Sequence, residues 1–88
     1  MKGMKAVQLI FSQISVKRLE QIQQWGGPEH DDLHTPEEWT AFIGKQLSYY
    51  VSGDEPRDRL LKIAALAIAA TESFDRNEEA NKILRDLS

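Results

Sequence analysis

The strongest fold signal in the chain is the stretch TPEEWTAFIGKQLSYY, residues 35–50. Thr35 is a good N-cap, Pro36 suits the first helical position, and Glu38 stands three residues after the cap, which together form a capping box. Apolar residues then recur at helical spacing and predict a buried stripe; they are Trp39, Phe42, Ile43, Leu47 and Tyr50. We therefore predict a helix over residues 36–51.

A helix is also predicted before this stretch, over residues 5–24. Apolar side chains recur there on one helical face; they are Met4, Val7, Phe11, Ile14, Ile22 and Trp25. The β-branched residues within 7–16 would also fit a strand, but the chain offers no second strand to pair with it. A helix is therefore the preferred interpretation.

After residue 51, Gly53 and Pro56 bracket two acids and predict a turn. A third helix is expected over residues 56–74, and Asn77 can cap a short C-terminal helix over residues 78–87. The sequence thus predicts an all-α fold with three main helices and a short fourth, in a single domain over residues 1–88.

The centre of the third helix, residues 63–70, reads IAALAIAA and is apolar on every side. Such a helix must be enclosed by neighbours, either within the fold or at a subunit interface. A chain of 88 residues has few elements with which to surround it. We therefore expect a homo-oligomer with part of this alanine-rich helix at the interface.

Composition narrows the class of protein. A net charge of −3, with no basic cluster beyond Lys17 and Arg18, argues against binding a nucleic-acid polymer. No run of 18 apolar residues is present, so we expect no membrane span. The chain has no cysteine, which removes disulfides and thiolate metal sites and fits a cytoplasmic location.

The segment between the first two predicted helices, WGGPEHDDLH at residues 25–34, is dense in metal-ligand side chains. They are Glu29, His30, Asp31, Asp32 and His34. Carboxylates suit magnesium or manganese, whereas zinc is favoured if both histidines bind. The alternative is that the acids make turn hydrogen bonds and the histidines lie at the surface, which we favour for each histidine taken alone.

A second pair of acids, Glu72 and Asp75, lies three residues apart and so shares one helical face. Two carboxylates in register on a largely buried helix point to a divalent ion, although Arg76 and Lys62 are possible partners. Glu38 follows the loop directly and is a further candidate metal ligand besides its role in capping.

The residues Gln24-Trp25-Gly26, then Glu29-His30-Asp31-Asp32 and His34, followed by an amphipathic and an alanine-rich helix, resemble a known family. It is the MazG-like all-α nucleoside triphosphate pyrophosphohydrolases, near the small phage and bacterial dATP/dGTP pyrophosphohydrolases. The resemblance implies a helical, oligomeric enzyme that uses magnesium to cut between the α- and β-phosphates. Its metals would be held by acidic pairs on two helices, E-x-x-E and E-x-x-D.

Glu72 and Asp75 match the second of these pairs. The first has no counterpart on the helix 36–51, and only Glu29 and Asp32 have that spacing. The resemblance therefore implies either an active hydrolase or a relative that has lost activity. Magnesium would be bound by Glu72, Asp75 and one or more of Glu29, Asp31, Asp32 and Glu38. Trp25, next to the loop, is the candidate to stack on a nucleobase, although aromatic residues at helical spacing more often belong to a core. The phosphate contact would come from Lys45, Arg59 or Lys62.

The alternative function is a non-enzymatic helical interaction module of phage or bacterial origin that dimerises through the third helix. The two hypotheses predict different positions for the acids. In the hydrolase, Glu72 and Asp75 face the loop 29–34 across a pocket. In the module, the acids scatter over the surface and pair with lysine and arginine.

Overall fold

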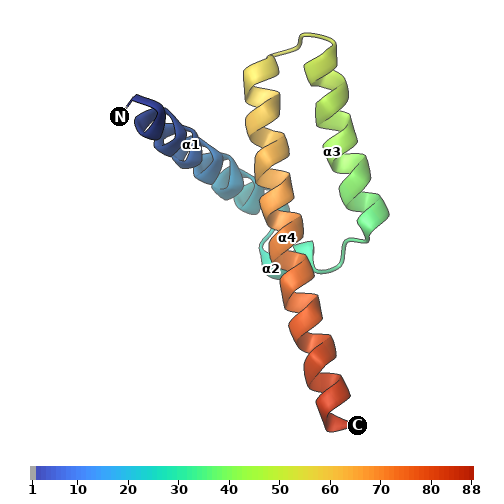
Figure 1. The fold of residues 1–88 in the computed structure, drawn as a ribbon. Helices are drawn as coiled ribbons and strands as arrows, with labels where there is room; N and C mark the ends of the chain where they lie inside the picture. The colour runs from blue at the N-terminus through green and yellow to red at the C-terminus, as the bar shows by residue number, and fades with distance from the viewer. Residues whose placement is uncertain (1) are drawn as a thin grey trace.

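The computed structural model describes residues 2–88 and is all-α, as predicted, with no strand among these residues (Figure 1). Helix α1 spans Lys2–Trp25, the short α2 spans Pro28–Asp31, α3 spans Pro36–Val51 and α4 spans Pro56–Leu87. None of the described helices is long and apolar enough to cross a membrane.

Helix α3 begins as its capping box predicts. The Thr35 hydroxyl accepts a hydrogen bond from the backbone N–H of Glu38 at 3.2 Å, and a Glu38 carboxylate oxygen accepts one from the backbone N–H of Thr35 at 3.1 Å. The second bond lowers the pKa of Glu38 below its usual value. At the other end, Gly53 adopts φ +84° in the predicted turn that reverses the chain into α4.

We expect Thr35→Ala to lower the free energy of unfolding by about 1 kcal/mol, because the backbone N–H of Glu38 at the start of α3 loses its partner, the Thr35 hydroxyl. In a domain of this size the melting temperature should fall by roughly 4–8 °C per kcal/mol. Thermal unfolding followed by circular dichroism measures the change, and Thr35→Ser, which keeps the hydroxyl, should melt near the wild-type temperature. Equal melting of the alanine and wild-type proteins would contradict this account of the cap.

The predicted break after residue 74 is wrong, because α4 is one continuous helix of 32 residues. Asn77 lies inside it rather than capping a separate helix. The stretch 71–82 contains neither glycine nor proline, and one asparagine within a helix costs only a few tenths of a kcal/mol. The segment 28–31, which was expected to lie between two helices, instead forms a short helix with Pro28 at its first position.

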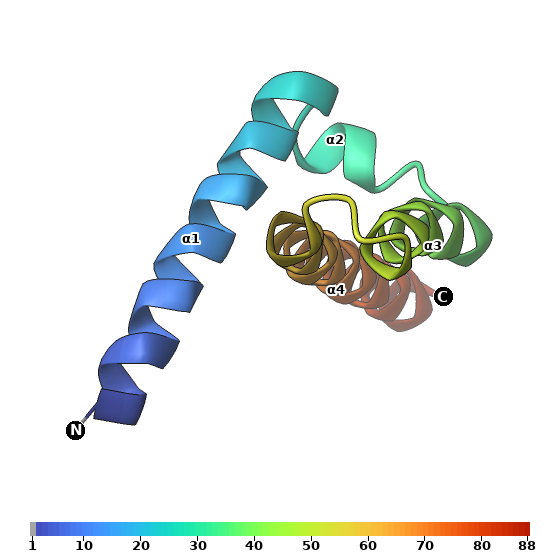
Figure 2. The ribbon, with the colours of Figure 1, turned by 90° about the horizontal axis from the view of Figure 1, so that it is seen from above.

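Helix α4 packs against each of the other three helices (Figure 2). It runs antiparallel to α3, crosses the second half of α1 and contacts α2, which lies between α1 and α3. The interior is small. Ala65 and Ala69 on α4 are buried and permit close approach, and Ile14 of α1 is the only large apolar side chain buried among the described residues.

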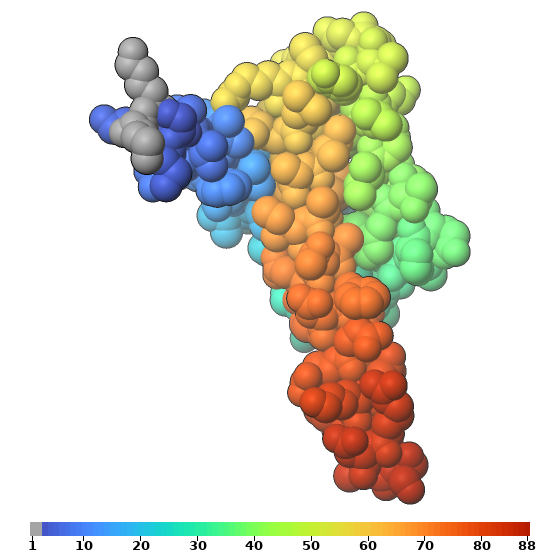
Figure 3. Space-filling view, in the orientation of Figure 1, coloured from blue at the N-terminus to red at the C-terminus, as the bar shows by residue number. Residues whose placement is uncertain are grey.

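Apolar surface remains exposed over much of the molecule. Helix α1 diverges from α4 toward its N-terminus, and the C-terminal part of α4 projects beyond the other helices (Figure 3). The predicted stripe on α3 is only partly covered, since Phe42, Leu47 and Tyr50 are each more than one-third exposed. The chain exposes 6635 Å², whereas a compact monomer of 10.0 kDa exposes about 5,200 Å².

Candidate functional site

The turn that carries α2 is fixed to the rest of the molecule by a buried ion pair. Asp31 is 6% exposed, and its carboxylate accepts a hydrogen bond from Nη2 of Arg18 on α1 at 2.7 Å. The backbone carbonyl of Asp31 also accepts a hydrogen bond from the hydroxyl of buried Ser73 on α4 at 3.3 Å. Asp31 therefore joins three helices.

A second arginine holds the end of the same turn. Arg76 on α4 contacts both oxygens of Asp32, with Nε donating at 3.0 and 3.1 Å and Nη2 at 2.8 Å. This bidentate pairing lowers the pKa of Asp32 and raises the pKa of Arg76. Glu72 lies between the two arginines, 3.7 Å from Nε of Arg18 and 3.8 Å from Nη1 of Arg76.

The six carboxylates predicted to bind magnesium therefore do not converge on one point. Asp31, Asp32 and Glu72 surround two arginines. Glu38 caps α3, and Asp75 lines a shallow depression on α4 together with Glu72. The sixth, Glu29, is exposed on α2. Within residues 2–88 no group of three or more acidic or imidazole side chains is placed to hold a metal ion. Arginine guanidinium groups contact three of the six carboxylates, those of Asp31, Asp32 and Glu72.

The two histidines, by contrast, face each other. Nε2 of His30 lies 3.2 Å from Nε2 of His34, and the rings are nearly perpendicular. Nδ1 of His34 lies 3.4 Å from the Glu38 carboxylate, which also lowers the pKa of Glu38. The His34 ring is enclosed by edge-on contacts with Trp39 and Phe42 of α3. The expectation that each histidine simply lies at the surface therefore does not describe this pair.

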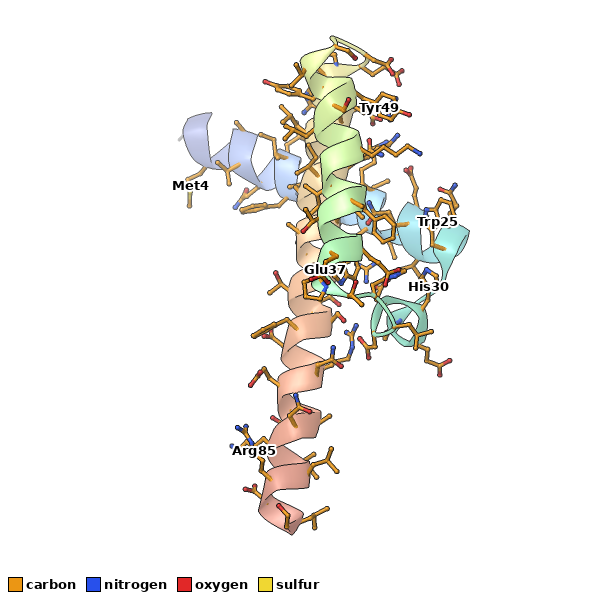
Figure 4. All side chains as sticks on the ribbon, turned by 90° about the vertical axis from the view of Figure 1, so that its right-hand side faces the viewer. Met4, Trp25, His30, Glu37, Tyr49 and Arg85 are labelled. Carbon is orange, nitrogen blue, oxygen red and sulfur yellow. The ribbon has the colours of Figure 1, made fainter. Side chains whose placement is uncertain are left out.

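A cleft of about 550 Å³ opens between α1, α2, α3 and α4 beside this pair. Its apolar wall is aromatic and includes Trp25, Trp39 and Phe42. Figure 4 shows Trp25, at the end of α1, and His30, on α2, on the same side of the molecule. Four cationic side chains and two acids also line the cleft; they are Lys17, Arg18, Lys45, Lys62, Glu20 and Asp31. Three of the four cations are paired with carboxylates, and two of those carboxylates, Asp58 and Glu72, lie outside the lining.

The cations of the cleft differ in how far they are neutralised. Lys17 and Lys62 share one carboxylate, that of Asp58, at 2.6 and 3.1 Å, which lowers the pKa of Asp58 and raises the pKa of Lys17. Lys45 makes no ion pair within the described residues and is thus the cation most available to a ligand. Arg59 is not part of the cleft lining; it pairs with Asp54 and lies over the ring of Tyr49.

Two buried polar atoms among the residues that line the cleft lack hydrogen-bond partners in the described chain. They are Nε of Arg18, a donor, and Oε1 of Gln21, an acceptor. Buried polar atoms in native proteins nearly always form a hydrogen bond, so these two atoms are exceptions. The carboxylate oxygen of Glu72 lies 3.7 Å from Nε of Arg18, which is beyond hydrogen-bond distance.

The structure brings together three residues that were predicted to contact substrate, since Trp25, Lys45 and Lys62 all line this cleft. Sequence reasoning missed the roles of Arg18 and Gln21. A signal was present, because both interrupt the apolar face of α1 between Ile14 and Trp25, where a purely structural helix would carry apolar residues.

Comparisons with protein-family models, curated proteins and solved structures found no match to this chain. The chemistry of the cleft therefore carries the functional proposal.

Proposed function

We propose that the cleft binds a nucleoside triphosphate through direct contacts with basic and aromatic side chains. The observation that carries this proposal is the combination of aromatic side chains with the unpaired Lys45 around one cavity of about 550 Å³ that three further cations also line. Aromatic faces stack on bases, whereas lysine and arginine side chains bind phosphate oxygens. A small molecule with a planar ring and a polyanionic tail satisfies both parts of the lining.

The arrangement supports binding more strongly than hydrolysis. The two carboxylates that line the cleft, Asp31 and Glu20, are paired with Arg18 and Lys17, which leaves the phosphate charge to be offset by side chains. Lys45 supplies an unpaired positive charge for this purpose. We therefore propose a relative of the MazG-like pyrophosphohydrolases that retains nucleotide binding without magnesium-dependent cleavage.

We expect the protein to bind dATP or dGTP in buffer containing a metal chelator, with a change in tryptophan fluorescence because Trp25 and Trp39 both line the cleft. Lys45→Ala should weaken binding about tenfold or more, since a hydrogen bond to a charged group contributes about 1.5–3 kcal/mol. Fluorescence titration of both proteins measures the ratio of dissociation constants.

The matched control is Lys82→Ala, which removes a lysine from the projecting part of α4, outside the cleft lining. Its affinity for the nucleotide should equal that of the wild type. Absence of binding at millimolar nucleotide, or equal weakening by both variants, would refute the proposal. Pyrophosphate release from a nucleoside triphosphate with added magnesium would instead establish the hydrolase that the resemblance implies.

The exposed apolar surface favours a second, compatible function, which is self-association. The face of α1 that is buried at Ile14 continues outward as Phe11, Val7 and Met4, which are between 45 and 62% exposed. Likewise, the face of α4 that carries buried Ala65 and Ala69 carries exposed apolar residues in its projecting part; they are Ile83, Leu84 and Leu87. We infer that a second copy of the chain covers these two stripes.

The area agrees with a dimer. A standard interface covers about 800 Å² on each partner, and permanent homodimers bury more. The single chain exposes roughly 1,400 Å² more than a compact monomer of the same mass, which is more than the 800 Å² that a standard interface covers on one partner.

A further inference from the structure

We propose that His30 and His34 form a two-point binding site for a zinc-class divalent cation (Zn²⁺, Ni²⁺ or Cu²⁺). This site is distinct from the magnesium site that the carboxylates predict and does not depend on nucleotide binding. The carrying observation is the approach of the two Nε2 atoms to 3.2 Å. In tetrahedral coordination with Zn–N bonds of 2.0–2.1 Å, two ligating nitrogens lie about 3.3–3.4 Å apart.

The hydrogen bonds around the pair leave a nitrogen lone pair available for the metal. The Glu38 carboxylate can only accept a hydrogen bond, so Nδ1 of neutral His34 carries the hydrogen that points to it. Nε2 of His34 is then a free lone pair, and without metal it accepts the N–H of His30 Nε2. When a cation binds, the hydrogen of His30 moves through solvent from Nε2 to Nδ1, so that both Nε2 atoms ligate and no net proton is released.

Metal-binding histidines commonly donate a hydrogen bond from their other ring nitrogen to a carboxylate. Glu38 is placed to play this part for Nδ1 of His34. Glu38 is itself held in place by the capping box at the start of α3. Trp39 and Phe42 pack against the His34 ring and fix its plane. The His34 side chain is therefore oriented before any metal arrives.

The backbone positions His30 equally firmly. A Cβ atom on Gly26, whose φ is +111°, would lie 3.0 Å from Cβ of His30. The close approach of the Gly26 backbone to His30 therefore depends on glycine at this position. The turn after His30 is tied to α1 and α4 through Asp31 and Asp32. Both histidines line the cleft, where water or an anionic oxygen can complete the coordination of the ion.

The test is a titration of chelator-treated protein with ZnCl₂, followed by isothermal calorimetry. We expect at most one zinc ion per chain, no comparable binding of MgCl₂, and tighter binding of Cu²⁺ than of Zn²⁺. His30→Ala and His34→Ala should each weaken zinc binding at least tenfold. Substitution with Co²⁺ should give the visible absorption bands of imidazole-bound cobalt, which both variants lose.

Glu29→Ala is the matched control, because it removes an exposed carboxylate from the same short helix without touching the pair. It should leave the zinc affinity unchanged. Circular dichroism of the histidine variants establishes that they fold, so that lost binding reports on the site. Zinc affinity that is insensitive to both histidine substitutions, or equal affinity for magnesium, would overturn the proposal.

Discussion

Replacing Asp31 with alanine is expected to lower the free energy of unfolding by about 3–5 kcal/mol, because the Arg18 guanidinium would lose its buried partner. Both side chains are about nine-tenths buried, at 11 and 8% exposed, so water does not replace the missing carboxylate. For a domain whose total stability is about 5–15 kcal/mol, this loss removes a large part of it. Urea unfolding followed by circular dichroism, at one fixed protein concentration, measures the difference.

Two further variants separate the ion pair from other effects of the substitution. Glu29→Ala changes an exposed acid in the same turn and should cost less than about 0.5 kcal/mol. The double variant Arg18→Met, Asp31→Leu removes both charges and should recover much of the lost stability, as apolar replacements of buried pairs do. If the single Asp31 variant unfolds at the same urea concentration as the wild type, the pair does not hold α2 to α1.

The sequence was sufficient for features that depend on local chemistry. The start of α3 follows from Thr35, Pro36 and Glu38, which are close in the chain and interact as their spacing predicts. The continuity of α4 through Asn77 was missed because a good capping residue was given more weight than the absence of any helix breaker around it. Side chains far apart in sequence do not decide either feature.

The site required tertiary information. The spacing of Glu72 and Asp75 correctly places them on the same helix, but it does not say that Glu72 meets Arg18, 54 positions earlier in the chain. Arg18 and Glu72 are far apart in sequence, and they meet only because α1 crosses α4. The composition of the loop 25–34 likewise indicated ligand-type residues without showing that the histidines, rather than the acids, approach each other.

Replacing Phe11 with aspartate is expected to disrupt the dimer that we propose and to leave a largely monomeric chain. Phe11 is 62% exposed in the single chain and lies in the stripe that we assign to the partner copy. Truncating an interface anchor costs about 2–4 kcal/mol, and burying an unpaired carboxylate adds to this cost. The dimer dissociation constant should therefore rise by roughly 30- to 1,000-fold, since 1.4 kcal/mol corresponds to a factor of ten. Analytical ultracentrifugation over a range of concentrations measures it.

The control for this experiment is Ser12→Asp, which adds the same charge one position along α1 at an exposed polar site, about 100° around the helix. It should preserve the dimer. Because so little apolar surface is buried within one chain, the monomeric Phe11 variant should also lose helical signal and melt at a lower temperature. A wild-type protein that sediments as a monomer with full helicity would show that α1 and α4 are stable with their apolar stripes in water. The single-chain packing around Ala65, Ala69 and Ile14 would then have to supply all of the stability.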